Sequence, residues 1–139
     1  MKNKRRGESG FSLIELLLIV VIVGLLATIA IPSLLKSRDA AEKASAIGTL
    51  HTLHINQTGF YTHNGRYASL VELNNYAGKK LGTMTGSTLI RGNYTYYIFP
   101  SSPGMIQNQF QILAVRFKDR RVISAFILEQ DGSIETLVD

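Results

Sequence analysis

The sequence predicts an α+β fold in which one long N-terminal helix packs on a four-stranded antiparallel sheet, giving a lollipop-shaped subunit. Three observations carry this prediction. An apolar run covers residues 11–31, and apolar residues then recur at helical spacing to residue 63. From residue 93 onward the period shortens to that of β-strands. Because a sheet of this size needs a helix over its apolar side, the two parts are expected to pack together.

The apolar run is long enough to cross a membrane. About 20 residues at 1.5 Å per residue span the roughly 30 Å hydrocarbon core as one helix. The ten residues before it contain four basic side chains and one acidic one. Since positively charged flanks remain in the cytoplasm, the N-terminus is expected inside and everything after Pro32 outside. The predicted location before any assembly is therefore the bacterial inner membrane, crossed once.

One acidic residue, Glu15, lies inside this apolar run. A carboxylate in hydrocarbon costs at least a few kcal/mol, so an ionisable group within a membrane span indicates a function and needs a partner. The alternative is that Glu15 reaches toward the interface or stays protonated.

The string GFSLIEL from Gly10 to Leu16, followed by Gly24 and Pro32, resembles the class III signal of type IV pilins and type II secretion pseudopilins. The resemblance implies a pilin-like fold and a membrane-embedded prepilin peptidase that cuts between Gly10 and Phe11 and N-methylates Phe11. It also implies that an inner-membrane assembly platform builds the subunits, with related minor pilins, into a homo-oligomeric filament. That filament would be extracellular or periplasmic.

Cleavage would have a direct electrostatic consequence. Removing residues 1–10 turns the amide of Phe11 into a free amine, which methylation leaves charged. Within one helix that amine is poorly placed for Glu15, whereas a staggered neighbouring subunit can bring its amine to the carboxylate and satisfy both charges. The resemblance implies this intersubunit contact, so Phe11 and Glu15 are the predicted assembly residues.

Gly24 and Pro32 are the predicted points of helix flexibility. Glycine lacks a side chain and proline lacks an amide donor, so the helix is weakest between them. The resemblance implies that this stretch extends or melts in a filament. A modest kink at Pro32, with a close helix contact at Gly24, explains the same residues equally well.

Two other kinds of protein fit parts of this pattern. A secreted solute-binding protein would carry a conventional secretory signal and begin near Ile31 after cleavage. Such a signal has a shorter apolar core of about 7 to 15 residues and a small-residue cleavage site, for which Thr28-Ile29-Ala30 is a weak match. A monomeric membrane-anchored binding domain would keep the span and tolerate loss of Glu15.

The chain is expected to divide into five segments. They are the removed basic leader (1–10), the transmembrane assembly segment (11–32), the amphipathic half of the helix (33–63), a connecting loop (64–92) and the sheet (93–139). The helix should end before the breaker pair Asn64-Gly65. The expected strands are Tyr94–Phe99, Gln109–Phe117, Val122–Glu129 and Ser133–Val138. Their turns are 100–104, 118–121 and the hairpin signal at 129–133.

Composition argues against an enzyme. The chain has no cysteine, so it has neither a cysteine nucleophile nor the disulfide of many type IVa major pilins, and it has no phosphate-binding loop. His51, His54 and His63 lack acidic companions and are expected on the helix surface rather than on a metal. Glu129, Asp131 and Glu135 are too few for the calcium site that major pseudopilins often hold. No cofactor is predicted.

The formal charge of +5 is mostly a property of the leader, whose removal leaves +2. Arg116, Lys118, Arg120 and Arg121 cluster around one predicted turn. Such a group could attract nucleic acid or another anionic surface through a salt-sensitive interaction, but we favour a solvated turn.

Overall fold

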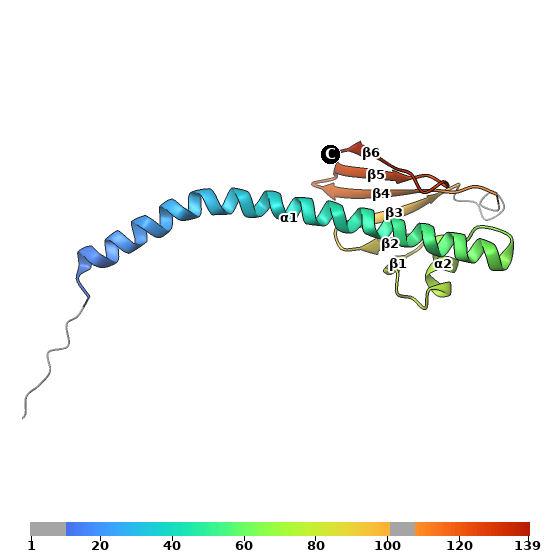
Figure 1. The fold of residues 1–139 in the computed structure, drawn as a ribbon, viewed down its shortest axis with the longest axis horizontal. Helices are drawn as coiled ribbons and strands as arrows, with labels where there is room; N and C mark the ends of the chain where they lie inside the picture. Colours follow the sequence, from blue (N-terminus) through green and yellow to red (C-terminus); the bar gives the residue numbers. More distant parts are fainter. Residues whose placement is uncertain (1–10, 101–107) are drawn as a thin grey trace, which may run out of the picture. The chain divides into compact units, whose positions relative to one another are not determined.

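The structure is a computed structural model that describes residues 11–100 and 108–139. The predicted leader (1–10) and most of the predicted turn at 100–104 lie outside the described residues. Figure 1 labels the elements, which are α1 (Leu13–Asn64), α2 (Leu70–Tyr76), β1 (Thr83–Thr85), β2 (Thr88–Arg91), β3 (Tyr94–Phe99), β4 (Gln111–Lys118), β5 (Arg121–Leu128) and β6 (Ile134–Val138). The chain separates into two compact units that meet between Asp39 and Ala40, and each is described by itself.

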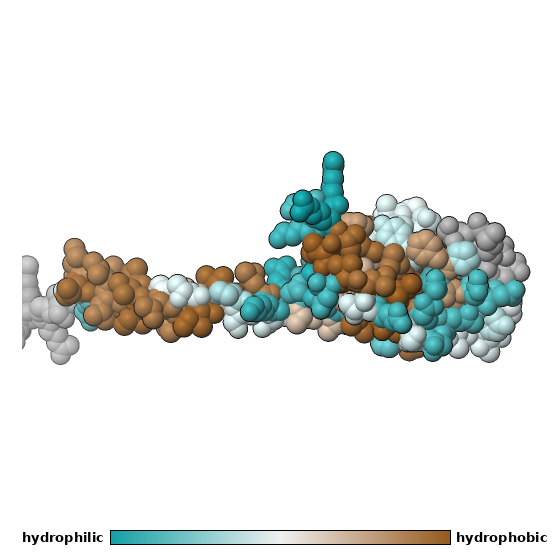
Figure 2. All heavy atoms as spheres, turned by 90° about the horizontal axis from the view of Figure 1, so that it is seen from above, coloured by the Kyte–Doolittle hydropathy of each residue, from teal (hydrophilic) through white to brown (hydrophobic). Residues whose placement is uncertain are grey.

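The N-terminal unit contains the apolar part of α1. By length and composition this helix can cross a membrane. Nearly all of its apolar side chains are exposed, and Figure 2 shows hydrophobic atoms along its surface. A helix that is apolar all round is stable only against lipid or other helices. The predicted transmembrane segment is therefore present as one helix with its apolar surface uncovered.

The C-terminal unit contains a six-stranded antiparallel sheet whose spatial order, β1-β2-β3-β4-β5-β6, follows the sequence. Each strand pairs with the next one, as in Ile98 with Ile112 and Ala114 with Phe126. β3 to β6 are the four predicted strands, with bounds within two residues of those expected. The predicted α+β class is confirmed, but the strand count is wrong.

The two missed strands, β1 and β2, lie in the segment predicted as a loop (64–92). Their turns are Gly86-Ser87 and Gly92-Asn93, and both glycines have a φ of +60°. A two-residue hairpin turn with glycine first and positive φ is the type II′ turn, which matches the twist of antiparallel strands. The glycine content of this segment thus marks hairpin turns rather than an irregular loop.

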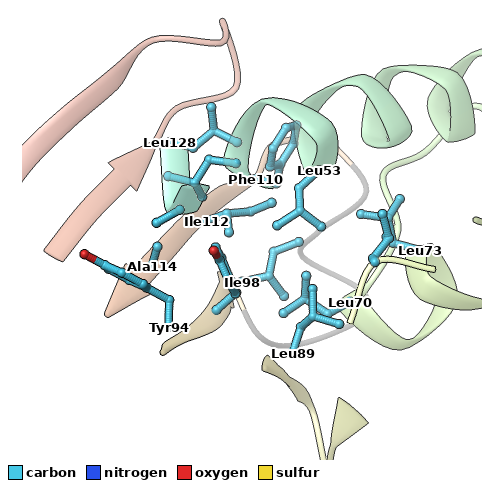
Figure 3. Packing of buried hydrophobic residues seen from close by; sticks show 14 of the residues in the cluster. Leu53, Leu70, Leu73, Leu89, Tyr94, Ile98, Phe110, Ile112, Ala114 and Leu128 are labelled. Atoms are coloured by element: carbon cyan, nitrogen blue, oxygen red, sulfur yellow. The ribbon is translucent and has the colours of Figure 1, made fainter. Parts of the chain in front are cut away.

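The core of the C-terminal unit forms between α1 and one face of the sheet. Helix residues Ala46, Leu50 and Leu53 are at most 2% exposed, and they belong to the same cluster as the inward-facing sheet residues. Figure 3 shows Leu53 among side chains from the sheet and from α2, including Leu70, Leu73, Leu89, Ile98, Ile112 and Leu128. The predicted packing of the helix on the sheet is present, and along α1 the buried cluster reaches Phe60.

Helix α1 ends within one residue of the position that the sequence predicts. Its last residue is Asn64, and Gly65 follows with a φ of +68° and donates its amide hydrogen to the carbonyl of Tyr61 at 2.8 Å. A left-handed glycine just after the last helical residue is a common way to satisfy the final carbonyls.

Helix α2 begins with a capping box. The Ser69 hydroxyl accepts the amide of Glu72 at 3.3 Å, and the Glu72 carboxylate accepts the amide of Ser69 at 3.0 Å. The same carboxylate accepts a hydrogen bond from the Arg66 guanidinium at 2.6 Å. These contacts fix the entry of the chain into α2.

Glu72 should make the stability of this unit depend on acid. The Arg66 guanidinium, helped by Ser69, lowers the pKa of Glu72 from 4.5 to about 2. A carboxyl group whose pKa is lowered by folding stabilises the folded state above its unfolded pKa, and that contribution is lost as the pH falls from 4.5 to about 2. We expect Glu72→Gln to lower the urea midpoint of the detergent-solubilised chain at neutral pH. The difference from wild type should shrink on acidification through that range; a constant difference would contradict the assignment.

Candidate assembly site

The first turn of α1 holds the predicted assembly residues. The carbonyl of Ser12 accepts the amides of Glu15 at 3.1 Å and Leu16 at 3.2 Å, so Ser12 is in the position of a helix cap. Glu15 therefore lies in the first turn, where the partial positive charge of the helix N-terminus favours a carboxylate. That effect contributes only about 0.3–1 kcal/mol, less than the cost of placing a carboxylate in hydrocarbon.

Phe11 precedes the helix and is 75% exposed. Glu15 is also exposed, and none of the described residues forms an ion pair or side-chain hydrogen bond with it. Gly10, the other predicted cleavage residue, lies outside the described residues. The structure therefore brings Phe11 and Glu15 to the same end of one helix without joining them, and the predicted contact between subunits stays a prediction.

Gly24 and Pro32 both lie inside α1, whose assignment is continuous across them. A methyl group added at Gly24 would meet nothing within 4 Å apart from the backbone of its own helix. In the isolated subunit the bare surface at Gly24 is thus available to another helix. Neither of the two interpretations of this pair is tested.

At the start of the C-terminal unit, charged residues join α1 to the sheet. Glu42 accepts hydrogen bonds from Arg116 at 2.7 Å and from Asn93 at 2.9 Å, and Lys43 pairs with Asp139. The side chains of Arg116 and Glu42 are only 11% and 23% exposed. The local sequence around Glu42 and Lys43 does not indicate these contacts, because the partners lie on or beside strands far along the chain.

Comparison with known proteins identifies the N-terminal region. Residues 5–31 match the family model of the prokaryotic N-terminal methylation motif. The type IV major pilin protein PilA of Myxococcus xanthus is 32% identical over 89 residues, which cover 59% of this chain and 40% of that protein. Over part of its length the chain is similar to type IV pilins and to type II secretion pseudopilins.

The similarity to pseudopilins is to type II secretion system core proteins G. The protein from Aeromonas hydrophila is 30% identical over 64 residues, covering 46% of this chain and 45% of that protein. The one from Vibrio cholerae is 39% identical over 45 residues, covering 32% and 31%. The chain thus spans less than half the length of the curated proteins that it matches. No solved structure matches it significantly.

The basic cluster predicted around the turn between β4 and β5 is smaller than expected. Arg116 is not part of an exposed group, because it is buried against Glu42 with its guanidinium 5.7 Å from the centre of the Tyr94 ring. Lys118, Arg120 and Arg121 are exposed around the turn between β4 and β5. Arg116 continues the core-facing series of Ile112 and Ala114 along β4, whereas Lys118 lies at the exposed end of that strand.

His54, His63 and Asp131 make hydrogen bonds within the fold. His51 is exposed, His63 bonds to the carbonyl of Gly59, and His54 bonds to the carbonyl of Gln130 at 3.0 Å. Hydrogen bonds from Ser133 to Asp131 lower the pKa of that carboxyl group. In the described part of the chain, no group of three or more metal-ligating side chains is placed to hold an ion.

Proposed function

We propose that this chain is a structural subunit of a type IV pilus-like filament. The prepilin peptidase would cut it between Gly10 and Phe11 and methylate Phe11, and an inner-membrane platform would assemble the mature subunits with related minor pilins. The observation that carries the proposal is Glu15 in the first turn of an exposed apolar helix, within a matched methylation motif. Such a subunit has a structural role and needs no catalytic group or cofactor.

Assembly would be favoured because it pairs two charges that are unpaired in the monomer. In the lipid-inserted monomer, Glu15 and the new amine of Phe11 each face hydrocarbon or the interface. A neighbour displaced by one to two helical turns, about 5–11 Å, would bring its amine level with Glu15. The pair forms where water is excluded, so removing either partner leaves a buried charge uncompensated. Glu15 would thereby set the axial register of the filament.

The proposal is tested by the N-terminus of the mature protein. Intact-mass and terminal-peptide mass spectrometry of protein from cells should show a chain that begins at Phe11 and carries one methyl group. A catalytically inactive peptidase strain should yield the chain with residues 1–10 attached. Mature protein that begins near Ile31 would instead indicate a conventional secretory signal, and uncut protein in wild-type cells would overturn the proposal.

The second candidate is a pseudopilin of a type II secretion system, which several relatives favour by their names. It shares the N-terminal processing, so a deletion strain must separate the two. Loss of surface filaments with normal protein export supports a pilus subunit. Retention of secreted proteins in the periplasm supports the pseudopilin, whose filament would be periplasmic.

A further inference from the structure

The turn between β4 and β5 presents cationic and apolar side chains together. We define the hairpin tip as residues 117–122. Its Lys118, Arg120 and Arg121 are exposed, and with Asp119 they give a net charge of +2. At the end of the sheet where β4 ends, Figure 2 shows hydrophilic atoms standing out beside a hydrophobic surface. None of the three cations has an ion-pair partner among the described residues.

The apolar part of the hairpin tip is a cross-strand pair. Phe117 and Val122 are register partners, so they lie side by side on one face of the sheet. They are 50% and 43% exposed. The two residues between Lys118 and Arg121 both have positive φ, as in a type I′ turn, which holds the cations at the end of this apolar pair. Exposed aromatic and aliphatic groups beside lysine and arginine are typical of surfaces that bind the membrane interface.

Contacts within the C-terminal unit hold the hairpin tip at the start of that unit. Arg116, the residue before Phe117, pairs with Glu42 at 2.7 Å. Glu42 lies ten positions after Pro32, the end of the predicted span. These ten residues rise about 15 Å as a helix and reach at most about 36 Å when extended. The covalent tether therefore keeps the tip within reach of the membrane surface at a high effective concentration.

We propose that the hairpin tip binds the anionic phospholipid headgroups of the membrane in which the unassembled subunit is anchored. This inference rests on the membrane insertion in the proposed function. Nucleic acid fits less well, because three cations can contact few phosphates and the apolar Phe117–Val122 pair cannot bind the phosphate backbone. Docking would hold the unassembled subunit at the membrane surface, and extraction into a filament would release it.

The tryptophan-free chain allows a direct test. Phe117→Trp places a single reporter in the hairpin tip of the full chain, inserted in nanodiscs of phosphatidylcholine alone or with phosphatidylglycerol. With phosphatidylglycerol we expect blue-shifted emission and quenching by headgroup spin-labelled lipid, both reversed by about 1 M salt, where the screening length is about 3 Å. Each basic residue near an anionic surface strengthens association about fivefold, so Lys118→Gln/Arg121→Gln should weaken docking about 25-fold.

The matched control is Lys79→Gln/Lys80→Gln, which removes the same charge from exposed positions away from the hairpin tip. It should leave quenching unchanged. Equal emission in both lipid compositions overturns the proposal. An equal loss of quenching in the two double variants also overturns it. Emission that changes with the number of chains per disc rather than with lipid charge indicates a second copy as partner and also overturns it. Failure of the chain to enter discs would instead contradict the proposed membrane insertion.

Discussion

Glu15→Ala is expected to abolish filament assembly while leaving membrane insertion and leader cleavage intact. Insertion should survive because the change makes the span more apolar. Assembly should fail because each contact would retain the Phe11 amine without its carboxylate. Breaking a buried ion pair from one side costs about 3–5 kcal/mol, equivalent to an about 10²–10⁴-fold weaker contact. Immunoblots of sheared filament and membrane fractions measure the effect.

Glu135→Ala is the matched control, since it removes one exposed carboxylate from β6. It should assemble as wild type does. The mature size of the Glu15→Ala subunit must be verified, so that a processing defect is not mistaken for an assembly defect. Wild-type filament yield from correctly processed Glu15→Ala protein would refute the intersubunit contact and favour a carboxyl group that lies protonated near the interface.

The parts of the fold that were predicted are those encoded by local pattern. The end of α1 follows from Asn64-Gly65, because glycine adopts the left-handed conformation that closes a helix. The strands from Tyr94 onward follow from β-branched and aromatic runs between turns. The hairpin at 129–133 forms as predicted, with the amide of Gly132 donating to the carbonyl of Glu129 at 3.0 Å. In each case the signal lies within a few consecutive residues.

The strand count was missed for a different reason. Residues 77–92 are rich in glycine, threonine and serine, a composition typical of loops. The informative feature was position: Gly86-Ser87 and Gly92-Asn93 are each two residues long and separate short segments of strand length. Two-residue turns with glycine first are a hairpin signal even when the flanking segments are only three or four residues long.

The contacts that join α1 to the rest of its unit could not be predicted from one sequence. Glu42 and Arg116 are 74 residues apart, and nothing local marks either as a partner of the other. For the candidate site the situation is reversed. Phe11 and Glu15 are marked by a short motif, but the proposed contact joins two chains, so one subunit holds only half of it. The motif therefore predicts Phe11 and Glu15 as assembly residues, but their contact with a neighbouring subunit must be tested by experiment.

The largest effect on stability is expected from Gln57, a polar residue that is fully buried in α1. Its amide nitrogen donates to the carbonyl of Ala68 at 2.6 Å, and its amide oxygen accepts the backbone N–H of Ala68 at 2.9 Å. Ala68 is also fully buried. Gln57→Leu keeps the volume but leaves both backbone groups unpaired, at about 1–3 kcal/mol each. We expect a loss of about 2–6 kcal/mol in the free energy of unfolding.

Urea unfolding of the detergent-solubilised chain measures this loss, and hydrogen exchange locates it. The Ala68 amide should exchange much faster in Gln57→Leu, because the acceptor of its hydrogen bond is gone. The exchange rates of amides in β4 and β5 should rise only as much as the lower free energy of unfolding requires. Thr58→Val, an exposed change one residue along the helix, should stay within about 0.5 kcal/mol of wild type. Slow Ala68 exchange in Gln57→Leu would show that this buried bridge does not hold the chain between α1 and α2, and that hydrophobic packing alone fixes it there.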